Sequence, residues 1–291
     1  MKRERKSMIS ILPDYHIHTR LCNHASGEME EYVDHALEIG LAEIGFSDHM
    51  PVMPEPHLCM SYDDLPTYVT RIRELQKKYE GMIAIRCGCE MDIVTNRVDE
   101  IKDIIQTYQF DYIIGSIHYL DTWPFDQVQY KDKFEMNNIE AIYKRFFSAF
   151  TKAAKLGLYD IAGHIDNIKC MGYRPQGDLS KYYERVASVM KSLDLTVELN
   201  TSGIDKPCGE PYPSMEFLRI LCQHEIPVTV GSDSHNPKEV GRHYDRACAM
   251  LKDAGYDHVV YYKNRKRFFK PLGFSENCQE LKQSSHSQRM G

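Results

Sequence analysis

The chain alternates between short apolar segments that suit β-strands and amphipathic segments that suit α-helices, and this alternation runs through most of its 291 residues. The apolar spacing predicts eight strands, which begin at residues 9, 42, 83, 112, 159, 196, 227 and 258. Helices are predicted between them, over 28–39, 65–79, 98–108, 137–156, 179–193, 214–224 and 237–254. Such alternation is typical of a (β/α) barrel or a doubly wound parallel sheet. No G-x-G-x-x-G follows the first predicted strand, which disfavours a dinucleotide-binding sheet.

No repeat or low-complexity linker divides the chain, so residues 1–272 are predicted to form one α/β unit. The polar residues 273–291 lack periodicity and are predicted to be a disordered tail. The chain has no apolar run of about 18 residues, the length that crosses a bilayer. We expect no secretory signal, because no long apolar core or small-residue cleavage site follows the basic residues 1–10. Its nine scattered cysteines, an odd number, favour reduced thiols. We therefore expect a cytoplasmic protein without a membrane partner.

The charge balance excludes one class of function. The chain has 42 Asp and Glu against 36 Lys and Arg, a formal net charge of -6. Proteins that coat nucleic acids are usually strongly basic, so we expect no nucleic-acid partner. A local basic pocket for a small anion remains compatible with this balance, and the sequence leaves the oligomeric state open.

Two histidines lie at the end of the first predicted strand, in Asp14-Tyr-His-Ile-His18. Alternate residues of a strand share a face, so His16 and His18 point the same way and can hold one metal ion. In (β/α) barrels, catalytic residues gather at the carboxyl ends of the strands. The ends of the other predicted strands are therefore informative.

Nearly every other predicted strand also ends in residues that can bind a metal. They are Asp48 and His49, Glu90, His118, His164 and Asp166, Glu198 and Asn200, and Asp233 and His235. Turn and capping preferences explain one aspartate, but not this whole set. Imidazole and carboxylate together suit Zn, Mn, Fe or Co better than Ca or Mg. We expect two or three divalent metal ions that share a bridging carboxylate.

Several motifs resemble the polymerase and histidinol phosphatase (PHP) superfamily. They are Asp14-Tyr-His-Ile-His-Thr19, Cys22-Asn-His24-Ala25, Ser47-Asp-His49, Gly88-Cys-Glu90, Gly115-Ser-Ile-His118, Gly163-His164-Ile-Asp166 and Gly231-Ser-Asp-Ser-His235. The segment Glu198-Leu-Asn-Thr-Ser-Gly203, followed by Tyr212-Pro-Ser214, is similar to the monofunctional histidinol-phosphate phosphatases of that superfamily.

The resemblance implies a distorted, seven-stranded (β/α)7 TIM-like barrel with three metals, so one of the eight predicted strands lies outside it. It implies one metal on His16, His18, Glu90 and Asp233. It implies a second on Glu90, His118 and His164, and a third on His24, His49 and His235. All nine positions hold the expected ligand type, which opposes the degenerate, non-catalytic PHP domains.

The resemblance further implies hydrolysis of L-histidinol phosphate to L-histidinol and inorganic phosphate, a step of histidine biosynthesis. A metal can supply hydroxide at neutral pH, and we expect a hydroxide that bridges two metals to attack phosphorus. Glu90, Asp233 and His235 are the expected catalytic residues, and Asp233 or a neighbouring histidine is expected to take or relay a proton. Asp14, Asp48 and Asp166 are candidates to orient the metal-binding histidines.

The match to the subfamily is weaker where phosphate should bind. Cys170 and Asp205 stand where subfamily members tend to have basic residues. The expected substrate contacts are Arg20, Arg174, Lys206 and Asn200, with His57 and His243 as weaker candidates. An aspartate near phosphate is unfavourable unless it turns away or binds a cationic group of the substrate. Histidinol phosphate carries such groups.

Three alternatives remain at this point. The first is a PHP phosphoesterase for another small phosphate monoester. The second is an amidohydrolase-like C–N hydrolase, which also places His-x-His on its first strand; that class often adds a carbamylated lysine, and no lysine ends a predicted strand here. The third is a metal-binding domain without catalytic activity.

Overall fold

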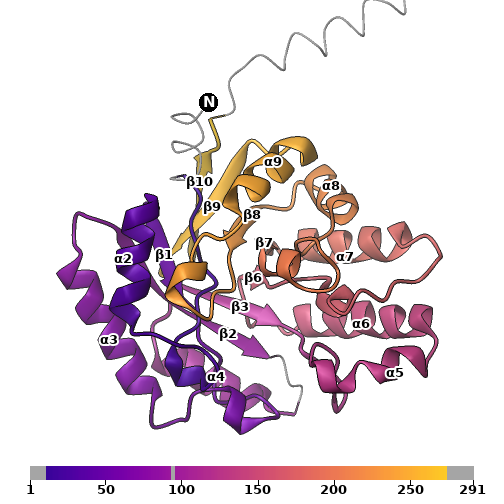
Figure 1. Ribbon diagram of the computed structural model, residues 1–291, viewed down its shortest axis with the longest axis horizontal. Helices are drawn as coiled ribbons and strands as arrows, with labels where there is room; N and C mark the ends of the chain where they lie inside the picture. The colour runs from indigo at the N-terminus through magenta and orange to yellow at the C-terminus, as the bar shows by residue number, and fades with distance from the viewer. Residues whose placement is uncertain (1–10, 93–95, 274–291) are drawn as a thin grey trace, which may run out of the picture.

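The computed structural model describes residues 11–92 and 96–273. Six parallel strands form one curved sheet in the order β1-β2-β3-β6-β7-β8, which lies at the centre of the molecule (Figure 1). The strands are β1 (Glu43–Phe46), β2 (Ala84–Asp92), β3 (Tyr112–Ser116), β6 (Ile161–Ala162), β7 (Thr196–Asn200) and β8 (Val228–Gly231). Because all the pairings are parallel, the carboxyl ends of these strands share one side of the molecule.

The segment Asp14–His18 joins the two edges of this sheet. On one side, the amide of Gly45 donates to the carbonyl of Asp14 at 2.8 Å. On the other side, the amide of His18 donates to the carbonyl of Ser234 at 2.9 Å. The segment makes isolated bridges rather than a continuous ladder, so the predicted first strand is correct in place but irregular. This segment takes the position of a seventh barrel strand, so the arrangement matches the predicted distorted barrel.

The helices follow the strands and cover the outside of the sheet (Figure 1). They are α2 (Met29–Ile39), α3 (Leu65–Lys78), α4 (Val98–Thr107), α6 (Ile139–Ala154), α7 (Ser180–Ser192), α8 (Met215–Gln223) and α9 (Tyr244–Ala254). Local signals set their ends: Asn138 and Ser214 accept backbone N–H bonds at the starts of α6 and α8. Gly40, at a φ of 86°, ends α2.

One predicted helix boundary is wrong. The segment predicted as a helix over 237–254 begins with the 3-10 turn η6 (Pro237–Glu239), and α9 starts only at Tyr244. Gly241 and His243 adopt φ values of 67° and 58°, in the left-handed region that a right-handed helix excludes. The resulting turn brings this segment back toward β8.

A hairpin of β9 (His258–Lys263) and β10 (Lys266–Pro271) covers the barrel end where the strands begin. The hydroxyl of Thr229 donates to the carbonyl of Val260 at 3.1 Å, and the amide of Tyr262 donates to the Tyr15 hydroxyl at 2.9 Å. Val260 and Tyr262 pack there in a separate core cluster with Tyr15, Tyr112, Ile114 and Ile161. The eighth predicted strand is therefore the one that lies outside the barrel.

The connection after β3 contains elements that the sequence pattern did not predict. A small hairpin of β4 (Tyr119–Leu120) and β5 (Trp123–Pro124) is followed by η3 (Val128–Tyr130) and α5 (Asp132–Glu135). Trp123 and Phe125 are buried and attach this connection to the core. The short turns η1 (Arg20–Cys22), η2 (Pro56–Leu58), η4 (Asn167–Lys169) and η5 (Ser202–Asp205) lie in other connections.

Within the described part of the chain, every helix is too short or too polar to cross a membrane. The predicted boundary between a unit over residues 1–272 and a disordered tail over 273–291 stays a prediction. Residues 274–291, and residues 9 and 10 of the predicted first strand, lie outside the described residues.

Candidate metal centre

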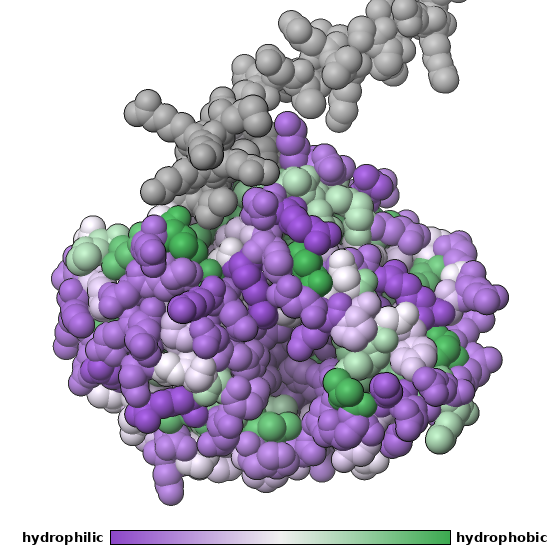
Figure 2. Space-filling model, viewed as in Figure 1, coloured by the Kyte–Doolittle hydropathy of each residue, from purple (hydrophilic) through white to green (hydrophobic). Residues whose placement is uncertain are grey.

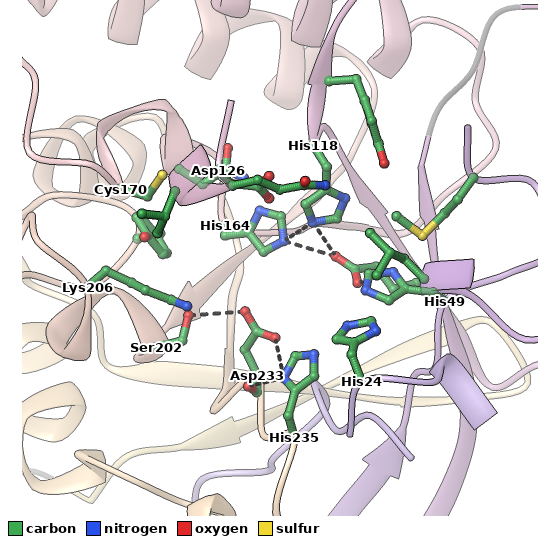
Figure 3. A pocket seen from close by; sticks show the side chains of 18 of the residues that line it. His24, His49, His118, Asp126, His164, Cys170, Ser202, Lys206, Asp233 and His235 are labelled. Carbon is green, nitrogen blue, oxygen red and sulfur yellow. Dashed lines mark hydrogen bonds and ion pairs between the residues drawn. The ribbon is translucent and has the colours of Figure 1, made fainter. Parts of the chain in front are cut away.

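The structure brings all nine predicted ligands together at the carboxyl ends of the strands. Ligand atoms within 4.8 Å of one another include the groups His16–His18–Asp233, His16–Glu90–His164 and His24–His49–His235. In Figure 3, His24, His49 and His235 face one another on one side of the cluster, and His118 and His164 lie together on another. Other groups, His18–Cys22–His235 and His18–His49–Glu90, cross the ligand sets that the resemblance implies. The division of these residues among individual metals therefore stays a prediction.

Glu90 occupies the centre of the cluster, near the end of β2. Its Oε1 lies 2.9 Å from Nε2 of His164 and 3.6 Å from Nε2 of His118. Its Oε2 lies 2.9 Å from Nδ1 of His49 and 3.3 Å from Nε2 of His16. Because the two oxygens face different histidines, this carboxylate has the geometry of a group that bridges two cations.

The spacing between neighbouring ligand atoms fits a shared ion. Two ligands of a tetrahedral ion at about 2.1 Å lie about 3.4 Å apart. Nε2 of His18 lies 3.4 Å from Oδ1 of Asp233, and Nε2 of His118 lies 3.2 Å from Nε2 of His164. The donor set of imidazoles and carboxylates suits Zn or a similar divalent transition metal.

Several buried atoms of the cluster lack a hydrogen-bond partner among the described residues. They are Nε2 of His16, both ring nitrogens of His18, Nδ1 of His49 and Oε2 of Glu90. A buried polar atom without a partner costs free energy, and these unpartnered atoms gather around the places where ligand atoms converge. Divalent cations would satisfy them, so the residues present fit the expected metals.

The charges of the cluster are strongly coupled. Burial raises the pKa of the Glu90 carboxyl, but His16, His49 and His118 outweigh it and hold that pKa well below its usual range. Burial lowers the pKa of His118, but Asp92 and Glu90 outweigh it and raise that pKa to about 10. The carboxylate is therefore ionised at neutral pH, and a metal must displace a proton from His118 to bind it.

Two buried carboxylates orient the histidines from behind. Oε1 of Glu198 lies 2.7 Å from Nδ1 of His16, and Oδ2 of Asp92 lies 2.8 Å from Nδ1 of His118. Such partners fix the ring orientation and direct the opposite nitrogen to the metal. Sequence reasoning assigned neither role. Asp92 follows Glu90 by two residues on β2, so the strand period could have indicated a shared face.

Of the three aspartates proposed for that role, Asp48 lies nearest to a histidine ring, with its Oδ1 3.5 Å from Nδ1 of His18. Asp14 instead accepts from the amides of Ser232 and Gly241, each at 2.9 Å. Asp166 accepts from the Lys169 ammonium at 2.7 Å and from a backbone amide. Asp14 and Asp166 therefore hold loops together and do not orient imidazoles.

The loop that carries Asp233 is held in a strained conformation. Asp233 has a φ of 54°, in the left-handed region that ordinary residues rarely adopt. Arg242 donates to the carbonyls of Ser232 and Asp233 at 2.9 and 2.8 Å. Asn200 lies behind the carboxylate, with its Nδ2 3.4 Å from Oδ2 of Asp233. Sequence reasoning missed Arg242, which lies on the turn that was predicted as helix.

A cavity of about 490 Å³ opens in front of the cluster. Figure 2 shows a hollow among mostly hydrophilic residues on the face where β2 and β3 end. His57, Cys170 and Lys206 line the cavity together with ligands of the cluster. Of the four predicted substrate contacts, only Lys206 is among the described lining residues.

The other predicted contacts lie elsewhere. Nε of Arg20 lies 3.3 Å from Oε1 of Glu28 in an exposed pair, and Arg174 pairs with Glu210. Asn200 is fully buried behind Asp233. Asp205 turns away from the cavity, because His243 binds its carboxylate at 2.9 Å. The aspartate that the sequence placed near phosphate therefore has a local partner in the protein.

Comparison with known proteins places this site in a family. Residues 14–202 match the PHP domain, and residues 217–246 match the PHP-associated segment. A relative from Deinococcus radiodurans, named "Probable histidinol-phosphatase", is 33% identical over 258 residues, which cover 88% of this chain and 98% of the relative. The chain belongs to the PHP domain family. The PHP match includes seven of the nine candidate ligands, and the other two, Asp233 and His235, lie in the PHP-associated segment.

Two further relatives extend the PHP comparison. The histidinol-phosphatase of Bacillus subtilis is 29% identical over 258 residues, which cover 80% of this chain and 96% of that protein. The crystal structure of histidinol phosphate phosphatase from Lactococcus lactis, complexed with Zn, L-histidinol and phosphate, superimposes with a TM-score of 0.75. It is 22% identical and covers 89% of this chain and 99% of its own. This likeness shows that the two proteins share a fold.

Proposed function

We propose that this PHP protein is a metal-dependent phosphatase that hydrolyses L-histidinol phosphate to L-histidinol and inorganic phosphate. The observation that carries the proposal is the convergence of nine histidine and carboxylate ligands around Glu90, at the base of an open cavity. The reaction class follows from this cluster. The substrate follows from the relatives of known name, which match along nearly their whole length.

The metal assignment is part of the proposal. We propose three divalent ions, of Zn, Mn, Fe or Co, held by His16, His18, His24, His49, Glu90, His118, His164, Asp233 and His235. Bound metals of this kind lower the pKa of water to about 7 and neutralise the charge of phosphoryl oxygens. The coordinating atoms and their spacing support the assignment.

The residues of the chain then have distinct roles. Glu90 holds the cluster together through both of its oxygens. Asp233, fixed by Asn200 and Arg242, is placed to take or relay a proton at the edge of the cavity, and His235 lies beside it with Nδ1 3.7 Å from Oδ1 of Asp233. Lys206 lines the cavity and is the proposed cationic contact of the phosphoryl group.

The site of action is the cytoplasm in this proposal. The eight described cysteines are free thiols. Unpaired thiols buried in the core are typical of proteins from reducing compartments.

The test combines elemental analysis of the purified protein with phosphate release from L-histidinol phosphate and from a panel of other phosphate monoesters. We expect bound transition metal, activity that a chelator abolishes and added metal restores, and the highest kcat/KM for histidinol phosphate. Equal, slow turnover of every monoester would contradict the substrate assignment. Unchanged turnover and metal content in His118→Ala would contradict the catalytic role of the cluster.

A further inference from the structure

The carboxylates that line the cavity differ in their surroundings. They are Glu90, Asp126 and Asp233. Glu90 and Asp233 belong to the histidine cluster, where they face imidazoles and the proposed metals. Asp126 lies just after β5, outside the proposed ligand sets. Among the described residues, its carboxylate has no hydrogen bond or ion pair with another side chain. Burial raises the pKa of this carboxyl, and His118, His164 and its own backbone amide lower it.

Two other carboxylates in this region already have hydrogen-bond partners in the protein. Glu55 accepts from the hydroxyl of Tyr119 and from Nε2 of Gln127, both at 2.6 Å. Asp92 binds His118 at 2.8 Å. Asp126 therefore keeps a carboxylate available to a ligand in the cavity, and a partly buried carboxylate is stabilised best by a cation that donates hydrogen bonds.

The backbone around Asp126 is anchored on both sides. Phe125 is fully buried, and its ring packs against Phe146 with centroids 5.5 Å apart. On the other side, Gln127 is tied to Glu55 across the cavity wall. Because the core and this hydrogen bond already position the residue, a ligand that binds it loses little free energy to ordering of the loop.

The cavity presents the opposite charge at a different place. Among the described residues that line the cavity, Lys206 is the only lysine or arginine. In Figure 3 it lies near Ser202 and Asp233, whereas Asp126 lies near His118 and His164. Cys170 is within electrostatic reach of both: burial raises the pKa of its thiol most, Asp126 raises it further, and Lys206 lowers it. The cavity therefore suits a small molecule that carries both an anionic and a cationic group.

We propose that Asp126 binds the ammonium group of a phosphate monoester whose phosphoryl group lies at the histidine cluster, and so selects aminoalkyl phosphates. This inference rests on the proposed function and names the residue that would set its substrate class. It also gives the cationic part of the substrate a different partner from Asp205, which His243 and Arg242 already bind.

The experiment compares L-histidinol phosphate with 3-(imidazol-4-yl)propyl phosphate, which lacks only the amino group. In Asp126→Asn we expect kcat/KM for histidinol phosphate to fall about 10- to 100-fold, the usual loss for a charged hydrogen bond, mainly through KM. Turnover of the analogue and the metal content should stay within about twofold of the wild type. Asp121→Asn is the matched control, because Asp121 lies in the adjacent β4–β5 hairpin, is 81% exposed and pairs with Arg145.

Other outcomes overturn the inference. Equal losses on both compounds, or loss of metal, would show that Asp126 acts through the cluster, and unchanged kinetics would show that it does not bind substrate. Failure of the wild type to hydrolyse histidinol phosphate would instead contradict the proposed function. Asp126 would then be tested with ethanolamine phosphate against ethyl phosphate, where the variant must again lose activity only on the amine.

Discussion

Glu198 Oε1 lies 2.7 Å from Nδ1 of His16, and both side chains are almost completely shielded from solvent. The same carboxylate accepts from the backbone amide of His164 through its other oxygen, at 2.9 Å. One residue at the end of β7 therefore positions two histidines that come from distant parts of the chain. Its contribution can be measured apart from that of the ligands themselves.

We expect Glu198→Gln to weaken metal binding about 10- to 100-fold, the usual effect of removing a carboxylate behind a ligating histidine. The amide keeps the size of the side chain but loses the charge that strengthens the imidazole as a ligand. Competition with a chromophoric chelator measures the affinity. Glu225→Gln, which alters an exposed pair with Lys191, is the control. An unchanged metal affinity in Glu198→Gln would argue against this role.

Gly231, at the end of β8, allows the close approach of Glu198 and His16. A Cβ at this position would lie 2.1 Å from Oε1 of Glu198 and 2.6 Å from Cβ of His16. We expect Gly231→Ala to lower the free energy of unfolding by about 1–3 kcal/mol and to reduce metal content. Urea denaturation and elemental analysis test this. Gly177→Ala should change neither, since a Cβ there meets nothing within 4 Å; similar losses in both variants would contradict the explanation.

Lys169 is buried with its ammonium 2.7 Å from Oδ2 of Asp166 and 2.8 Å from Oε1 of Glu210. Removing one partner from a buried ion pair leaves an uncompensated charge, so Lys169→Met should lower the free energy of unfolding by about 3–5 kcal/mol. Arg174→Met removes an outer, 40% exposed partner of Glu210 and should cost less than about 1 kcal/mol. Equilibrium unfolding of the metal-loaded proteins compares them. Equal effects of the two substitutions would be inconsistent with a buried network.

Metal binding should release protons. The pKa of about 10 at His118 lies above that of a free imidazole, so the metal-free protein holds this proton at pH 7. The proton's contribution to the stability of the metal-free protein is complete below about pH 6.5 and is lost as the pH rises through about 10. Metal binding requires the neutral ring, so Zn affinity should rise with pH.

Calorimetric titration with Zn in buffers of different ionisation enthalpy counts the released protons. His118→Ala should release about one fewer than the wild type. An affinity for Zn that does not change between pH 6 and 8, with no proton release, would refute this coupling.

Much of the site could be predicted from the sequence because its ligands recur at one kind of place. His49, Glu90, His118 and His164 each follow or end a strand whose apolar pattern is clear, and parallel strands bring such positions together. The family resemblance implied that one of the eight strands lies outside the barrel, but it did not indicate that this is the eighth. Its own pattern does not distinguish a barrel strand from the β9–β10 hairpin.

The supporting residues could not be predicted in the same way. Glu198 and His16 are 182 positions apart, and their contact depends on the neighbours that β7 receives in the closed barrel. Arg242 acts from a turn that depends on positive φ values at Gly241 and His243, which local propensity in a helix-like segment does not reveal. Arg20 pairs with Glu28, and Arg174 pairs with Glu210, instead of lining the cavity. These two glutamates do not lie at strand ends, so the strand-end pattern could not reveal the pairs.

The segment that closes the barrel also carries His16 and His18, and it is held by isolated bridges instead of a ladder. The joint between the first and last strands is therefore the place where backbone pairing is sparse and metal-binding nitrogens are dense. Cations bound by His16 and His18 together with Glu90 and Asp233 would cross-link this segment to the ends of β2 and β8. The ions proposed for catalysis would thus also stabilise the closed barrel. Loss of transition metals would then lower both the stability of the fold and the activity of the enzyme.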